Sequence, residues 1–137
     1  MSNSTIVTLV DFSGMTPQLM AQSEKYAKAL NARVILLHIH PKDTTLRDKE
    51  TSLADYKILT DLGAALSKTG VNVLVEQLND ADHRRTLDEC RMWDAELIIV
   101  GSHHHGFLHN WFVKCFTCEM HESAHCPVLV LPAPPAA

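Results

Sequence analysis

The chain has little of what membrane-spanning, exported and nucleic-acid-binding proteins need. No apolar run in its 137 residues approaches the roughly 20 residues of a membrane-spanning helix. Residues 1–5 contain no basic segment followed by an apolar one, so we expect no signal peptide. The formal net charge of -4 offers no basic face for nucleic acid. These absences predict a cytoplasmic protein that binds neither membranes nor nucleic acid.

Cysteine is also scarce and unevenly spread. Its four positions are Cys90, Cys115, Cys118 and Cys126, which we interpret as reduced thiols because no export signal accompanies them. A chain of this length with 46% hydrophobic residues can bury a core without disulfides or metal. We therefore expect residues 1–137 to form one domain, with 132–137 as a frayed Pro/Ala tail.

Short apolar runs alternate with longer amphipathic segments. The runs predict strands at Thr5–Val10, Val34–Ile39, Val71–Leu78, Leu97–Val100 and Val128–Leu131. Helices are expected from Thr16 to about Leu30, from Glu50 to Lys68, from Asp82 to Trp93, and between the last two strands. This alternation predicts an α/β domain with a parallel sheet and helices on both faces.

Local signals refine the helix boundaries and faces. Thr16 followed by Pro17 predicts an N-cap with proline at the first helical position, and Gly70 is expected as a helix C-cap. The second helix is expected to bury one apolar side, namely Leu53, Tyr56, Leu59, Leu62, Gly63 and Leu66. In the third helix, Leu87 and Cys90 are expected to face inward.

Several segments together resemble the universal stress protein family. They are Val10-Asp11-Phe12-Ser13, Val34–Pro41, Glu96–Ser102 (ELIIVGS) and Cys126–Pro132 (CPVLVLP). The resemblance implies a three-layer α/β/α fold with five parallel strands in the order 3-2-1-4-5. It also implies a stress-response or signalling binding protein that forms a homodimer, often through the last strand. That strand comprises Val128, Leu129, Val130 and Leu131.

Family members that bind ATP carry a glycine-rich phosphate loop. Its pattern is Gly, two residues, Gly, nine residues, Gly, then Ser or Thr, which places backbone N–H groups and a hydroxyl around the phosphates. In this sequence Gly101 fits, but His104, Lys114 and Cys115 occupy the other positions. If those backbones require positive φ, each side chain costs about 1–2 kcal/mol. Our leading prediction is therefore a binding protein without the standard ATP loop and with no expected cofactor.

An alternative keeps adenine-nucleotide binding, of ATP or AMP, through an altered histidine-rich loop. Asp11 matches the family position at the adenine end, although a carboxylate there could simply cap a turn. Lys114 could attract a phosphate as a point charge, and Gly106 could supply a displaced turn. The candidate set is completed by neighbouring residues, namely Phe12, His40, Ser102, His103, His104 and Cys115.

A second alternative is a metal-binding variant. Cys115, Cys118 and His121 are spaced to share one helical face and are ligand types that suit zinc. The competing interpretation is that both cysteines are small core residues. Their distance from the preceding strand is wrong for a thioredoxin-like redox pair.

A conventional enzyme is not predicted. Gly101-Ser102-His103 lacks the Gly-x-Ser-x-Gly turn of a hydrolase nucleophile. Slow ATP hydrolysis, which the resemblance would allow, needs the phosphate loop that this sequence mostly lacks. No catalytic residue is assigned.

Overall fold

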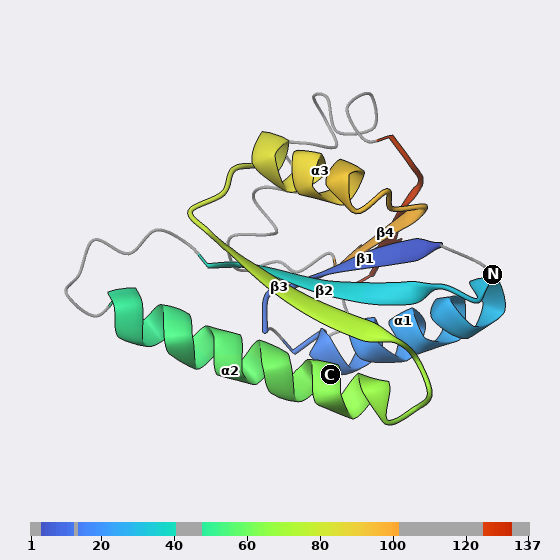
Figure 1. Cartoon of the computed structure of the whole chain (residues 1–137), viewed down its shortest axis with the longest axis horizontal. Coiled ribbons are helices and arrows are strands. Elements are labelled where there is room, and N and C mark those ends of the chain that lie inside the picture. Colours follow the sequence, from blue (N-terminus) through green and yellow to red (C-terminus); the bar gives the residue numbers. More distant parts are fainter. Residues whose placement is uncertain (1–3, 13, 41–47, 102–124, 133–137) are drawn as a thin grey trace.

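The computed structural model describes residues 4–12, 14–40, 48–101 and 125–132, which form an open parallel sheet (Figure 1). The strands are β1 (Thr5–Val10), β2 (Arg33–His40), β3 (Val73–Asn79), β4 (Leu97–Gly101) and β5 (Val128–Leu131). They lie in the order β3-β2-β1-β4-β5, and every neighbouring pair is parallel. The predicted strand order is confirmed.

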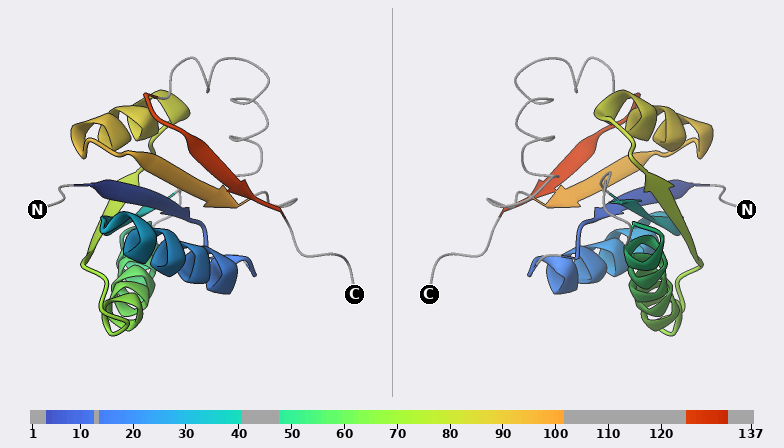
Figure 2. Two further views of the ribbon diagram at one scale, coloured as in Figure 1. Left: turned by 90° about the vertical axis from the view of Figure 1, so that its right-hand side faces the viewer. Right: turned by 90° about the vertical axis from the view of Figure 1, so that its left-hand side faces the viewer.

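Helices cover both faces of the sheet. Two of them, α1 (Thr16–Leu30) and α2 (Asp48–Ser67), lie on one face, while α3 (His83–Met92) lies on the other (Figures 1 and 2). This arrangement confirms the three-layer α/β/α architecture. The helix predicted between β4 and β5 falls outside the described residues.

The central strand β1 is buried along its whole length. Successive side chains point to opposite faces, so Val7 and Leu9 join the core beneath α3, while Ile6 and Val10 join the core beneath α1 and α2. A parallel strand covered on both faces needs apolar residues at consecutive positions. That requirement explains the continuous apolar runs in the sequence.

Most of the predicted helix boundaries hold. Gly70 follows α2 with a φ of 99°, which glycine adopts without strain. Asp82 caps α3, since its side chain accepts a 2.9 Å hydrogen bond from the Arg85 N–H. The prediction of Thr16 as an N-cap is wrong by one residue. Met15 occupies the cap position of α1 and makes no side-chain cap bond.

The predicted apolar side of α2 is correct only for its C-terminal half. Leu59 and Leu66 are buried, but Leu53 is 70% exposed and Tyr56 is 45% exposed. The first turns of α2 lie against polar groups at the carboxyl end of β2, where the side chain of Asp55 faces the sheet. The helix surface that meets the sheet is therefore polar at its start and apolar further on, and Leu53 and Tyr56 fall outside it.

Cys90 faces the core, as predicted, and is fully buried beside Leu87 in the α3-side cluster. Desolvation by burial raises the pKa of its thiol to about 12. The thiol therefore stays protonated at neutral pH and acts as a small apolar core residue.

None of the helices in the described segments combines the length and the apolar character needed to cross a membrane.

Candidate functional site

The strand order creates one place where the chain reverses its direction across the sheet. From β1 the chain runs outward to β2 and β3, then returns to β4 on the other side of β1. In open α/β sheets, ligands bind in the crevice outside the carboxyl ends of the strands at such a switch point. Asp11 and Phe12 follow β1, and Gly101 ends β4. These predicted site residues are therefore brought to the same edge of the sheet.

Gly101 packs closely against Met15. A Cβ atom at this position would lie 3.0 Å from Met15 Sδ and 3.2 Å from Met15 Cε. The φ of Gly101 lies outside the left-handed region. Among the glycines that the structure describes, Gly70 is the one with positive φ. The close approach of the buried Met15 favours a small residue here, independently of any phosphate.

Phe12 is held in an unusual backbone conformation. Its φ is 60°, in the left-handed region that an aromatic residue seldom adopts. The ring lies against His38 of β2, with the ring centroids 4.2 Å apart and the planes tilted by 31°. Left-handed non-glycine residues cost about 1–3 kcal/mol and concentrate at functional sites, so the turn after β1 is a candidate part of a binding site.

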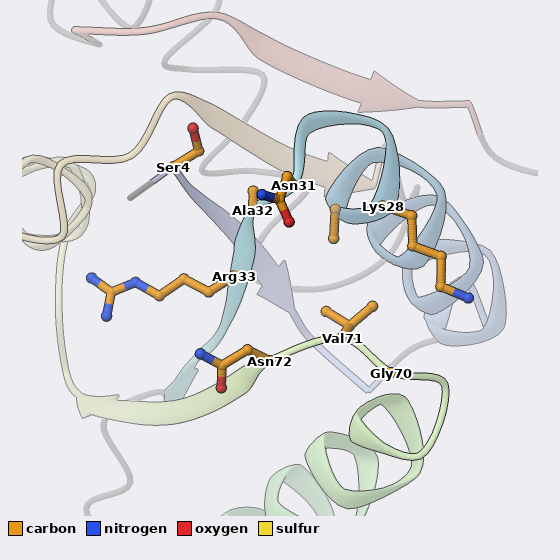
Figure 3. A pocket seen from close by; sticks show the side chains of 9 residues that line it. Ser4, Lys28, Asn31, Ala32, Arg33, Gly70, Val71 and Asn72 are labelled. Atoms are coloured by element: carbon orange, nitrogen blue, oxygen red, sulfur yellow. The ribbon is translucent and has the colours of Figure 1, made fainter. Parts of the chain in front are cut away.

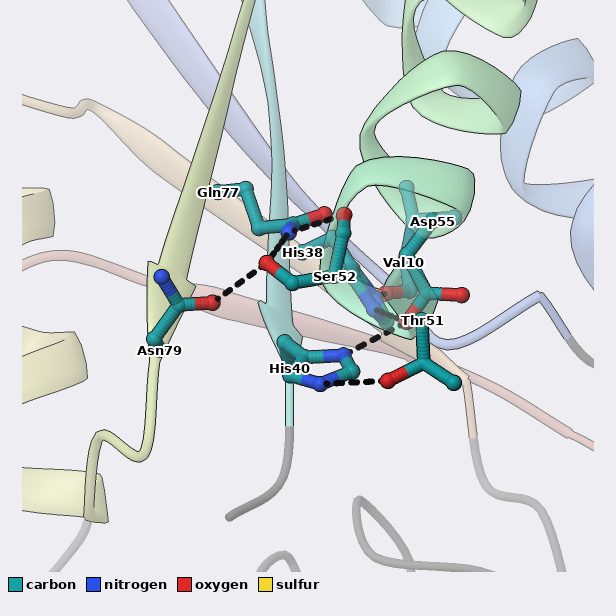
Figure 4. A network of polar contacts seen from close by, with 8 residues as sticks. All are labelled: Val10, His38, His40, Thr51, Ser52, Asp55, Gln77 and Asn79. Carbon is teal, nitrogen blue, oxygen red and sulfur yellow. Dashed lines mark hydrogen bonds and ion pairs between the residues drawn. The ribbon is translucent and has the colours of Figure 1, made fainter. Parts of the chain in front are cut away.

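A His-Asp-His cluster, consisting of His38, His40 and Asp55, lies beside this turn (Figure 4). Asp55 Oδ2 is 3.2 Å from His38 Nε2 and 2.7 Å from His40 Nδ1. The other ring nitrogen of His38, Nδ1, lies 2.7 Å from the Val10 carbonyl oxygen. Both histidine side chains are only 6% exposed, while that of Asp55 is 26% exposed. The cluster is therefore buried on the β2 side and open to solvent on the α2 side.

A second set of hydrogen bonds fixes the start of α2 against β3. Gln77 Nε2 donates to the Ser52 carbonyl oxygen at 2.9 Å and to Ser52 Oγ at 3.0 Å. The Ser52 hydroxyl donates to Asn79 Oδ1 at 3.1 Å (Figure 4). Because Ser52 lies one helical turn before Asp55, these bonds hold the carboxylate at a defined place above β2.

Some of the candidate residues predicted from the sequence lie at this edge of the sheet. Asp11, Phe12, His40 and Gly101 lie there, and the structure additionally places His40 in contact with Asp55. The remaining candidates, Ser102, His103, His104, Gly106, Lys114, Cys115, Cys118 and His121, fall outside the described residues.

His38 and Asp55 were missed. The available signal was the pair of histidines two apart in a strand, since alternate residues share one face. Nothing in the sequence marks Asp55 as their partner, because that contact depends on how α2 crosses the sheet.

An open hollow of about 610 Å³ lies at the opposite edge, near the amino ends of the strands (Figure 3). Its lining includes Lys28, Arg33 and Asn72. Arg33 Nε donates to Thr5 Oγ1 at 2.9 Å and its guanidinium lies over the Trp93 ring, while Lys28 pairs with Glu24 at 3.7 Å. Both cations are engaged and the hollow lies away from the switch point, so we assign no function to it.

The strand order places this chain in the class of open, doubly wound α/β proteins. The chain belongs to the universal stress protein family, whose family model matches residues 2–132. Comparison with the curated proteins finds no match.

Solved structures share the fold at low sequence identity. A universal stress protein from Archaeoglobus fulgidus in complex with dAMP is 18% identical, with a TM-score of 0.70, covering 95% of this chain and 98% of the other. A universal stress protein in complex with cAMP is 15% identical, with a TM-score of 0.71 and coverages of 96% and 98%. A family member from Burkholderia pseudomallei is 22% identical, with a TM-score of 0.68 and coverages of 95% and 96%.

Proposed function

We propose that this chain is a stress-response binding protein whose switch-point crevice does not hold a triphosphate in the standard mode of its family. One observation carries the proposal: His104, Lys114 and Cys115 occupy loop positions that call for glycine, glycine and a hydroxyl residue. The remaining glycine, Gly101, packs closely against Met15, a contact that favours a small residue whether or not a phosphate binds. A loop without its glycines cannot bring backbone N–H groups close around several phosphates.

A second candidate function is binding of an adenine mononucleotide. Two structural relatives were solved with dAMP and with cAMP, ligands that carry a single phosphate. On this chain the half-buried Asp11 and Phe12 follow the end of β1, at the switch-point edge of the sheet. A monophosphate needs fewer loop contacts than a triphosphate, so the nucleoside end of the site could serve without the glycine-rich loop.

Thermal melting with and without ligand separates these functions. A ligand that binds only the native state raises stability by about 2.7 kcal/mol at a hundredfold excess over its dissociation constant. We expect no shift with ATP and magnesium for the wild type. A shift with AMP but not ATP would support the mononucleotide function, and a clear shift with ATP would contradict the leading proposal.

A His104→Gly/Lys114→Gly double variant is the companion measurement. If ATP stabilises the variant but not the wild type, the crevice is intact and those two side chains close it. If neither protein responds to ATP, the triphosphate mode has been lost beyond these two positions.

We further propose a homodimer paired through β5. This strand is at the edge of the sheet, with β4 as its neighbour, and Val128, Leu129 and Val130 are half-buried. The Ile98 N–H donates to the Pro127 carbonyl at 3.0 Å. The parallel ladder that follows from this bond aims the backbone of Leu129 at β4 and that of Val130 away from it. An apolar edge with outward N–H groups favours pairing with a second copy.

The pairing is tested with a Val130→Pro variant, because proline removes an outward N–H while leaving the ladder with β4 intact. Val130→Ala is the matched control, since it shortens the same side chain and keeps the N–H. We expect size-exclusion chromatography with light scattering to show a dimer for the wild type and control, and a monomer for Val130→Pro. A wild-type monomer, or a dimeric proline variant, would contradict pairing through β5.

A further inference from the structure

The His-Asp-His cluster contains an unbalanced set of hydrogen-bonding atoms. The Val10 carbonyl oxygen can only accept, so His38 Nδ1, 2.7 Å away, must carry a proton. In a neutral imidazole the other nitrogen, Nε2, is then an acceptor. That nitrogen faces Asp55 Oδ2 at 3.2 Å, and an ionised carboxylate is also only an acceptor. Two acceptors face each other unless the ring carries a proton on both nitrogens, as in an ion pair, or a bound cation lies between them.

His40 does not remove this mismatch. Its Nδ1–H donates to the same carboxylate oxygen at 2.7 Å, which satisfies one lone pair of Oδ2. Its other nitrogen, Nε2, lies 3.5 Å from the hydroxyl oxygen of Thr51. In the neutral ring, the lone pair of His38 Nε2 therefore still points at Asp55, in a position where the histidine side chains are 6% exposed and water screening is weak.

We propose that the His-Asp-His cluster is a binding site for a divalent cation of the zinc class. The protein ligands are His38 Nε2, His40 Nδ1 and Asp55 Oδ2, which lie within 4.8 Å of one another. Imidazole nitrogens and a carboxylate oxygen are ligands that zinc accepts, and three protein ligands leave a fourth position for water or another donor atom. The site is distinct from the Cys115, Cys118 and His121 set that the sequence suggested.

The spacing of these atoms suits the metal. Tetrahedral zinc with bonds of about 2.0–2.1 Å holds its ligand atoms about 3.3 Å apart. His38 Nε2 and Asp55 Oδ2 are already 3.2 Å apart, whereas His40 Nδ1 must move back from its 2.7 Å hydrogen bond. Metal binding displaces the proton from His40 Nδ1. The neutral ring then carries its proton on Nε2, facing the hydroxyl oxygen of Thr51.

Neighbouring groups orient the three proposed metal ligands. A histidine that binds metal usually donates its second N–H to a carbonyl or carboxylate, as His38 does to Val10. The Phe12 ring against His38 restricts the imidazole further. The bonds from Gln77 to Ser52 fix the turn of α2 that precedes Asp55. The orientation of each ligand thus has a separate structural cause.

The test is a zinc titration of the full chain, purified without a histidine tag and stripped with a chelator, against a competing chromogenic chelator. We expect the wild type to bind zinc. The nearly isosteric Asp55→Asn variant should bind zinc at least roughly 100-fold more weakly, because loss of even an outer-shell partner lowers metal affinity 10–100-fold. Asp61→Asn is the matched control because it removes an exposed carboxylate from the same helix. Unchanged affinity in Asp55→Asn, or no binding by the wild type, would overturn the proposal.

A second measurement separates this site from the cysteines and the loop histidines. Cobalt bound by two histidines and one carboxylate should lack the thiolate-to-metal charge-transfer band that cysteine ligands produce. The His103→Ala/His104→Ala/His105→Ala variant should keep its zinc. A thiolate band, or loss of zinc in this loop variant, would place the metal elsewhere and overturn the assignment. Circular dichroism confirms that each variant is folded, and the result does not depend on whether the crevice binds a nucleotide.

Discussion

Ile35→Ala is expected to destabilise the domain by about 2–5 kcal/mol. Ile35 is fully buried in β2, within the core cluster beneath α3. Shortening this side chain removes apolar contacts and leaves a cavity that the surrounding strands can close only in part. Urea denaturation that follows secondary structure would measure the loss as a lower midpoint with an unchanged slope.

Leu74→Ala is the matched control for this substitution. Leu74 lies beside Ile35 in the register of β2 and β3, so both side chains point to the same face of the sheet. Leu74 is nevertheless 42% exposed, because β3 is the edge strand. We expect its truncation to cost less than about 1 kcal/mol, in proportion to the smaller area buried. Equal losses of unfolding free energy for the two variants would show that the α3-side face of β3 is covered in solution.

Gly63→Ala is expected to destabilise the domain by about 1–3 kcal/mol, although alanine is the better helix former. A Cβ at Gly63 would lie 2.6 Å from Val75 Cγ1 of β3. Valine has a stiff χ1, so its methyl group cannot turn aside without cost. The overlap should push α2 away from the sheet, and the change in unfolding free energy is measured by denaturant titration.

The double variant Gly63→Ala/Val75→Ala tests the cause. Removing the valine methyl groups makes room for the new Cβ, so we expect the Gly63→Ala change to be nearly neutral or stabilising in that background. A double-mutant cycle separates this coupling from the packing lost at Val75. A stabilising effect of Gly63→Ala alone, near the roughly 1 kcal/mol of helix propensity, would show that the contact is not tight.

Gly101 offers a useful comparison. A Cβ there would lie 3.0 Å from Met15 Sδ, but this sulfur atom belongs to the flexible end of a methionine side chain. Tight contact alone does not decide the cost of a substitution, since a neighbour that can move relieves the overlap.

Much of the fold could be predicted because the relevant signals are local. Continuous apolar runs marked the strands, Gly70 and Asp82 marked helix ends, and the alternation of elements implied parallel pairing. The two incorrect predictions also rest on local patterns. The N-cap of α1 is Met15 and not Thr16, and the apolar spacing on α2 predicts burial as far as Leu53, which is exposed.

The candidate site was predictable only in part. Asp11 and Gly101 could be placed at strand ends, and the topology then brings those ends together. Asp55 could not be assigned a role, since its contact with His38 and His40 joins residues from separate elements. No periodicity encodes such a contact.

The sequence by itself determined the kinds of element, their order and the family, because these depend on short-range patterns of apolar residues and turns. Only the tertiary structure decided which faces are covered and which polar side chains meet. Leu74 is exposed because its strand lies at an edge, and His38 faces a carboxylate because α2 crosses β2 at that point. Both outcomes depend on the packing of elements distant in the chain, which a local pattern does not specify.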